Sequence, residues 1–111
     1  MLPSPLRPVE FEVLLTLATG ERHGYSIIQE TDRRTDGQVR LETATVYRAL
    51  KRLVDIGYVT PTERRPAADD DERRRYYRLT ARGRTAAVAE AGRLARLVAS
   101  ARAARLIPGR S

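Results

Sequence analysis

Residues 43–56 read TATVYRALKRLVDI, and the apolar side chains of this segment recur with the spacing of one helical face. Because successive residues of an α-helix are about 100° apart, Val46, Leu50 and Leu53 fall on one side. The opposite side gathers small and basic side chains, namely Ala44, Thr45, Arg48, Lys51 and Arg52. A helix in the major groove of DNA needs this division, since its apolar face anchors it while cations meet bases and phosphates. The segment therefore predicts a DNA-reading helix; the plainer interpretation is a surface helix with a solvated basic face.

The first turn of this helix is suited to a phosphate. Thr43 is a competent N-cap, and the small side chains of Ala44 and Thr45 let the backbone approach the groove edge. Free N–H groups and the positive end of the helix dipole favour an anion at this end. The predicted DNA contacts on the helix are Thr43, Ala44, Thr45, Arg48, Lys51, Arg52 and Tyr47, the last at the flank of the apolar face.

Two helices are expected before this segment. Prolines at positions 3, 5 and 8 predict an extended arm over residues 1–7, then a helix from Pro8 to about residue 19 that Gly20 ends. A second helix is expected over residues 24–34, with Tyr25, Ile28 and Thr31 on one face. Residues 39–41 are compatible with a very short strand. Together with residues 43–56, these elements predict a helix-turn-helix.

A hairpin and one more helix are expected after it. Residues 58–63 and 74–79 alternate as strands do, and residues 64–72 form a polar loop between them. Thr80 is expected to cap a last helix that runs to about residue 106. The fold class expected is mostly α with a small β-hairpin: a winged helix-turn-helix over residues 8–80, a long C-terminal helix over 81–107 and a tail over 108–111.

The hairpin and the second helix add further predicted DNA contacts. Arginines flank the hairpin loop, where a wing commonly touches phosphates or the minor groove; those predicted to do so are Arg64, Arg65, Arg74 and Arg75. Residues 69–72 at its tip are all acidic, and we favour a solvated tip over one whose acids pair with the arginines. Tyr25 either donates its hydroxyl to a phosphate or packs beneath the third helix, and the residues do not decide between these. His23 is interpreted as a turn residue.

The last helix carries a heptad-like seam. Apolar residues recur at intervals of four, three, four and three, with a leucine beside them: Ala87, Ala91, Leu94, Val98 and Ala101, with Leu97. We expect this seam to form a homodimer that holds two reading helices about one DNA turn, roughly 34 Å, apart for a palindromic operator. The alternative is packing on the first helix of the same chain.

Composition narrows the class of protein. Residues 1–81 hold 14 basic and 13 acidic side chains (+1), and residues 82–111 hold seven arginines and Glu90 (+6), so most of the net charge of +7 lies in residues 82–111. The absence of cysteine excludes a disulfide framework, and a single histidine excludes the usual zinc sites. No nucleophile–base pair or phosphate-binding glycine loop is present, so we expect neither an enzyme nor a cofactor. No apolar stretch is long enough for a bilayer, which predicts a cytoplasmic protein without a membrane partner.

Several motifs together resemble the PadR family of transcriptional regulators. They are residues 14–17 with His23-Gly24-Tyr25, then Thr45-Val46-Tyr47 with Leu50, Leu53 and Gly57-Tyr58-Val59, and last residues 75–80 with Gly83. The resemblance covers roughly residues 9–98, and it depends on the order and spacing of the motifs. It implies a dimeric winged-helix repressor with a single C-terminal dimerisation helix, released by an aromatic or drug-like effector. Ala44 replaces a common glycine or serine and Arg48 a common proline, so a different target sequence is expected.

The function predicted from the sequence is a sequence-specific DNA-binding transcriptional regulator, a dimeric repressor relieved by a small molecule. The alternative is a winged-helix module for protein–protein interaction that does not bind specific DNA.

Overall fold

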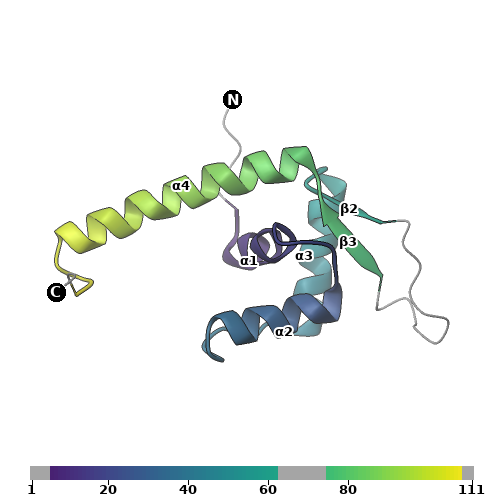
Figure 1. Cartoon of the computed structure of the whole chain (residues 1–111), viewed down its shortest axis with the longest axis horizontal. Helices are drawn as coiled ribbons and strands as arrows, with labels where there is room; N and C mark the ends of the chain where they lie inside the picture. Colours follow the sequence, from purple (N-terminus) through teal and green to yellow (C-terminus); the bar gives the residue numbers. More distant parts are fainter. Residues whose placement is uncertain (1–5, 63–74, 109–111) are drawn as a thin grey trace.

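In the computed structural model, which describes residues 6–62 and 75–108, the chain forms four helices and a three-stranded sheet (Figure 1). The elements are α1 (Pro8–Leu17), β1 (Arg22–His23), α2 (Gly24–Arg34), α3 (Thr43–Asp55), β2 (Val59–Pro61), β3 (Tyr76–Leu79) and α4 (Ala81–Ala103). The expected fold class, mostly helical with a small hairpin and a long last helix, is confirmed. The loop predicted over residues 64–72 lies outside the described residues.

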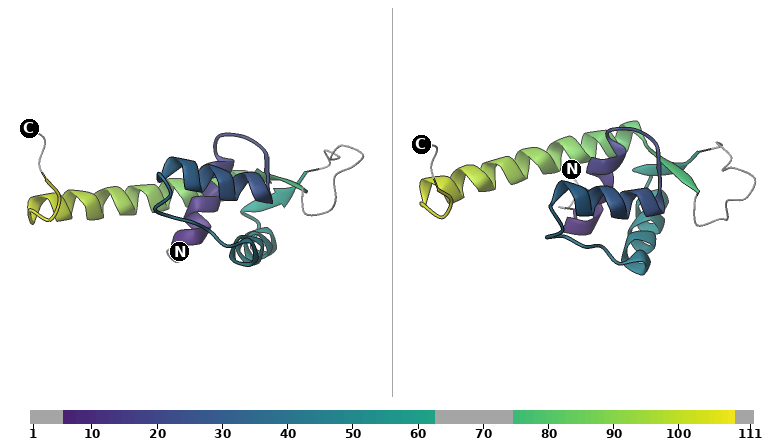
Figure 2. Two further views of the ribbon diagram at one scale, coloured as in Figure 1. Left: turned by 90° about the horizontal axis from the view of Figure 1, so that it is seen from below. Right: turned by 60° about the horizontal axis from the view of Figure 1, so that its bottom comes forward.

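Helix α1 lies at the centre of the molecule, between α4 and the pair α2 and α3 (Figures 1 and 2). Its broad apolar surface therefore has partners on several sides, and Val13 and Leu14 are completely buried. The predicted apolar face of α3 is confirmed, since Val46, Leu50 and Leu53 are all buried in the same core. This packing fixes which side of α3 faces outward.

The buried face of α2 includes Thr31 as predicted but otherwise differs from the predicted one. Gly24, Ile27 and Thr31 are buried, whereas Ile28 is only partly buried and Tyr25 is exposed. The helix is rotated because Gly24, which has no side chain, permits the close approach of a tyrosine ring from α3. The spacing 24, 27 and 31 is also a helical stripe, so sequence periodicity alone did not select between the two faces.

The sheet has the order β1-β3-β2, with β3 antiparallel to both neighbours. The hairpin of β2 and β3 is confirmed, and Val59 pairs with Leu79. The third strand was predicted at residues 39–41 but lies instead at Arg22–His23. Residues 39–41 stay in a loop in which the Val39 N–H donates to the Thr35 hydroxyl across 3.0 Å, so their backbone is held locally.

The ends of α3 and the start of α4 have clear local causes. The N-cap of α3 is Glu42, one residue before the predicted Thr43. Gly57 follows α3 with φ of +86°, and the next N–H, that of Tyr58, donates to the Leu53 carbonyl across 2.9 Å. This is the Schellman ending that glycine favours. Thr80 caps α4 as predicted, since its hydroxyl accepts from a backbone N–H three residues later across 3.0 Å.

Helix α4 extends well beyond the rest of the domain (Figure 1). Its first turns lie over α1, and its C-terminal half continues away from the other helices (Figure 2). It ends at Ala103, slightly before the predicted residue 106, where Arg105 adopts a left-handed backbone with φ of +63°. None of the helices in the described ranges combines the length and the apolar character that crossing a bilayer would require.

Candidate nucleic-acid interface

The outward side of α3 presents two basic side chains with weak local partners. Arg48 is exposed, and its guanidinium donates to the Thr45 hydroxyl across 3.4 Å. The Lys51 side chain is 80% exposed, and its ammonium lies 3.6 Å from the Asp55 carboxylate one turn later. Exposed pairs of this kind contribute about 1 kcal/mol at most, so an anionic partner can displace them at little cost. Both cations are therefore available at the surface.

The first turn of α3 is open to solvent. Thr43 and Ala44 are exposed, and Thr45 is partly buried. The N-cap residue Glu42 makes no side-chain capping hydrogen bond. The turn thus offers backbone N–H groups at the surface, although the Glu42 carboxylate opposes an incoming phosphate at the same end.

Arg52, another predicted contact, is exposed but pairs with a buried carboxylate of α1. Its guanidinium Nη1 donates to Glu10 Oε2 across 2.9 Å, which joins α3 to α1. Arg52 is thereby distinguished from Arg48 and Lys51, whose partners among the described residues lie within α3.

Tyr47 covers the start of α2. A Cβ atom on Gly24 would lie 2.5 Å from the Tyr47 hydroxyl oxygen, so the ring packs directly on the glycine backbone. The same turn is capped by His23, whose Nδ1 accepts from the Ser26 N–H across 3.1 Å. His23 is thus the N-cap of α2 and part of β1, in agreement with its interpretation as a turn residue. Tyr47, predicted as a DNA contact, lies where α3 meets α2.

Tyr25 projects from the first turn of α2 and is 53% exposed. The interpretation that Tyr25 packs beneath α3 is wrong, because its side chain is exposed to solvent; the ring that packs on the start of α2 is that of Tyr47. The other interpretation, a hydroxyl offered to a phosphate, is compatible with this exposure.

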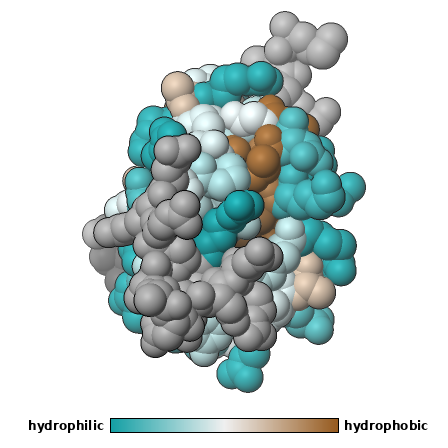
Figure 3. All heavy atoms as spheres, turned by 90° about the vertical axis from the view of Figure 1, so that its right-hand side faces the viewer, coloured by the Kyte–Doolittle hydropathy of each residue, from teal (hydrophilic) through white to brown (hydrophobic). Residues whose placement is uncertain are grey.

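The wing contributes one described arginine of the four predicted. Arg75 is exposed just before β3, whereas Arg64, Arg65 and Arg74 lie outside the described residues. Seen from the wing side, the surface is mostly hydrophilic, with a narrow hydrophobic strip between hydrophilic side chains (Figure 3).

Two exposed arginines near these elements were not assigned from the sequence. Arg40 lies in the loop before α3, with its Nε 3.8 Å from Asp32 Oδ1. Arg78 lies on β3 opposite Thr60 and is exposed. Two features of the sequence could have identified these arginines. Arg40 lies three residues before the start of α3. Arg78 alternates with Tyr77 and Leu79, which pack against the core.

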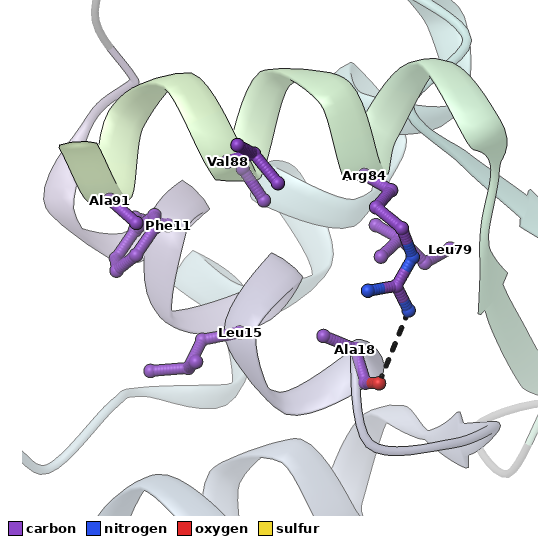
Figure 4. A pocket seen from close by; sticks show the side chains of 8 residues that line it. Phe11, Leu15, Ala18, Leu79, Arg84, Val88 and Ala91 are labelled. Atoms are coloured by element: carbon purple, nitrogen blue, oxygen red, sulfur yellow. Dashed lines mark hydrogen bonds between the residues drawn. The ribbon is translucent and has the colours of Figure 1, made fainter.

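The predicted seam of α4 divides into two parts. Ala87 and Ala91 line an apolar groove of about 170 Å³ against α1, together with Phe11 and Leu15 (Figure 4). Arg84 stands at its edge, where the guanidinium donates to the Ala18 carbonyl across 3.4 Å. Further along α4, Leu97 is 54% exposed and Val98 is exposed as well. The first part therefore packs near α1 of the same chain, and the second part is open to a partner.

Glu90 is a buried carboxylate of α4 that pairs within its own helix and accepts a backbone hydrogen bond from Leu6. Glu90 is buried, and both of its carboxylate oxygens accept from Arg93, across 3.1 and 2.5 Å. These hydrogen bonds lower the pKa of Glu90, aided by a backbone hydrogen bond from Leu6, although burial acts in the opposite direction. The end of the arm is thereby held against α4. Among residues 6–62 and 75–108, no three His, Cys, Asp or Glu side chains lie together as a metal site would require.

Comparison with known proteins gives consistent matches. Residues 13–89 match the transcriptional regulator PadR-like family. A transcriptional regulator from Clostridium thermocellum shares 28% identity, with a TM-score of 0.65 over 83% of this chain and 86% of the other. Bacillus subtilis PadR in complex with operator DNA shares 25% identity, with a TM-score of 0.62 over 73% of this chain but only 45% of the other. A PadR family regulator from Clostridium difficile, 19% identical over 85% of this chain and 94% of the other with a TM-score of 0.69, supports the fold. No curated protein matches the chain.

Proposed function

The chain belongs to the PadR-like family of transcriptional regulators, and we propose that it binds double-stranded DNA as a homodimer with α3 in the major groove. The main support for this proposal is that α3 has one buried apolar face and one exposed basic face. Val46, Leu50 and Leu53 are buried, while Arg48 and Lys51 stand exposed on the outward side. A groove-reading helix requires a fixed apolar face and free cations opposite it.

Each proposed contact has a separate role. Arg48 and Lys51 reach base edges or phosphates from the middle of α3, and the first turn of α3 approaches the backbone. The exposed hydroxyl of Tyr25 donates to a phosphate from the start of α2. Arg75 reaches the DNA from the base of the wing; Arg64, Arg65 and Arg74 are proposed to act with it.

The dimer is proposed to form along α4. Leu97 and Val98 are exposed on a helix that extends beyond its own domain, and a second copy would remove them from water. Two copies of α3 would then read the two halves of a palindromic operator. The structure of B. subtilis PadR in complex with operator DNA supports the proposal that the present chain also binds DNA.

Repression relieved by a small molecule is the finer part of the proposal. An operator-bound dimer blocks transcription, and a ligand that changes the spacing of the two α3 helices releases it. The groove of about 170 Å³ between α1 and α4 is smaller than the roughly 300 Å³ of the smallest usual ligand pockets. An effector site would therefore need walls from both protomers.

Selection of duplexes from a random pool, followed by binding measurements at several salt concentrations, tests the proposal. The log of the affinity should fall with the log of salt concentration, with a slope near −0.9 for each phosphate contacted. Lys51→Ala and Arg48→Ala should each weaken binding without lowering the melting temperature, whereas Arg102→Ala, on the exposed last turn of α4, serves as the control of equal charge change.

The alternative function, a winged-helix module that binds another protein, predicts a different result. Binding to duplex DNA would then be absent or insensitive to salt, and the Lys51 and Arg102 variants would behave alike. Enrichment of a palindromic sequence would exclude this alternative.

A further inference from the structure

Glu10 is a buried carboxylate with two separate hydrogen-bond donors. Its side chain is 2% exposed, on the helix α1 whose residues are mostly apolar. One oxygen, Oε1, accepts from the Arg7 backbone N–H across 2.9 Å. The other, Oε2, accepts from Arg52 of α3, also across 2.9 Å. Glu10 therefore closes the start of α1 and joins this helix to α3.

The Arg52 guanidinium is the charged partner that a buried carboxylate requires. Removing one member of a buried pair leaves an uncompensated charge, which is strongly unfavourable. Arg52 is 46% exposed, although its guanidinium lies 2.9 Å from the buried Glu10 carboxylate. Because Glu10 offsets its charge, Arg52 attracts a phosphate less strongly than a cation without a buried carboxylate beside it does. Lys51, the preceding residue, pairs within the described part of the chain with the exposed Asp55, and no buried carboxylate offsets its charge there.

A second ionic contact joins α1 to α2. Arg34, at the end of α2, forms an ion pair with Glu12 and donates to the Thr16 hydroxyl across 3.2 Å. Both helices of the helix-turn-helix are thus attached to α1 by arginines, and α1 packs between them and α4 (Figure 2). The orientation of α3 relative to the remainder of the domain depends on these contacts as well as on the core.

We propose that Arg52 is a positioning residue, held by Glu10, that sets the orientation of α3 and does not itself contact DNA. The sequence predicted Arg52 as a DNA contact because it lies on the polar side of the helix, and the geometry assigns it another role. This inference rests on the proposed function, since it divides the basic residues of α3 into readers, Arg48 and Lys51, and one anchor.

The test compares neighbouring cations of the full-length chain. Arg52→Ala and Lys51→Ala remove the same charge from adjacent positions. Binding of each variant to a fluorescein-labelled 30-base-pair duplex, enriched from the random pool, is measured across salt concentrations, and thermal unfolding is recorded in parallel. We expect Lys51→Ala to make the log–log salt slope shallower by about 0.9 with an unchanged melting temperature. Arg52→Ala should lower the melting temperature and leave the salt slope unchanged.

Glu10→Gln provides a variant that changes no DNA-facing side chain. At a temperature where every variant is folded, we expect its affinity for the duplex to fall roughly 3- to 30-fold, because Arg52 loses the charge of its partner carboxylate and holds α3 to α1 less firmly. In the double variant Glu10→Gln/Arg52→Gln, the affinity loss should be smaller than the product of the single losses, because both changes break one contact. The comparison of Glu10→Gln with the double variant tests the inference even if Arg52→Ala does not fold.

Three results would overturn the inference. They are a shallower salt slope for Arg52→Ala, an unaltered affinity for folded Glu10→Gln, and independent effects in the double variant. If the wild-type chain binds no duplex, the proposed function itself fails and this inference fails with it. Wild-type binding with any of the three results overturns the role of Arg52 alone.

Discussion

Gly83 lies where the first turn of α4 crosses the end of the α3–β2 turn, and no side chain fits there. A Cβ atom at this position would lie 2.0 Å from the Tyr58 carbonyl oxygen and 2.8 Å from Leu79 Cδ1. The Leu79 side chain can rotate, but the Tyr58 carbonyl belongs to the backbone and accepts from the Thr80 N–H across 3.0 Å. Gly83→Ala must therefore displace the start of α4 by more than 1 Å or disrupt this hydrogen bond.

The free-energy cost follows from these contacts. Overpacking costs about 1–3 kcal/mol, and the lost hydrogen bond adds about 1 kcal/mol. The higher helix propensity of alanine returns about 1 kcal/mol. A net loss of about 1–3 kcal/mol should lower the melting temperature of a domain of this size by roughly 4–24 °C.

Gly92 of the same helix provides the matched control. A Cβ there would meet only Arg96 Nη1, at an ordinary 3.6 Å, so Gly92→Ala gains helix propensity without a clash. We expect its melting temperature to rise by about 4–8 °C, with both variants followed by circular dichroism at one protein concentration. If Gly83→Ala melts at or above the wild-type temperature, the close approach of α4 to Tyr58 is wrong.

Further predictions concern other contacts. The pKa of Glu90 is lowered in the folded protein, so the ionised Glu90 side chain contributes its full stability above its ordinary pKa of 4.5. This stability is lost as the pH falls through the lower folded-state pKa. Glu90→Gln should therefore make acid unfolding below pH 4.5 less steep. Thr80→Val removes the N-cap of α4 and the hydrogen bond that the Thr80 hydroxyl donates to the Gly57 carbonyl across 2.6 Å. Urea unfolding should show that the free energy of unfolding falls by about 2 kcal/mol. Leu97→Glu should convert the dimer to a monomer in sedimentation velocity while the helix content is kept, and a persisting dimer would contradict the proposed seam. Tyr25→Phe should weaken duplex binding at an unchanged melting temperature, whereas equal affinity would remove the proposed phosphate contact.

Where the sequence pattern was unambiguous, the structure agrees with it. The large apolar residues of α3 fall on a single helical face, and Val46, Leu50 and Leu53 are buried as expected. The Thr80 cap and the ending of α3 at Gly57 also follow from local chemistry. Local signals failed for α2, where two stripes were possible, and for the third strand. Residues 22–23 contain no strand pattern, and they pair because the turn before α2 brings them beside β3.

The amino-acid sequence by itself determined which side of the segment over residues 43–56 faces the core and which side carries cations, because a helical repeat converts spacing directly into direction. It could not determine what each cation contacts. Arg48, Lys51 and Arg52 share one side of α3, yet only the packing of α1 against α3 brings a buried Glu10 within reach of Arg52. This partner is 42 residues away in the chain, and no helical period relates the two. Tertiary structure alone therefore separated the anchor of α3 from the cations left free at its surface.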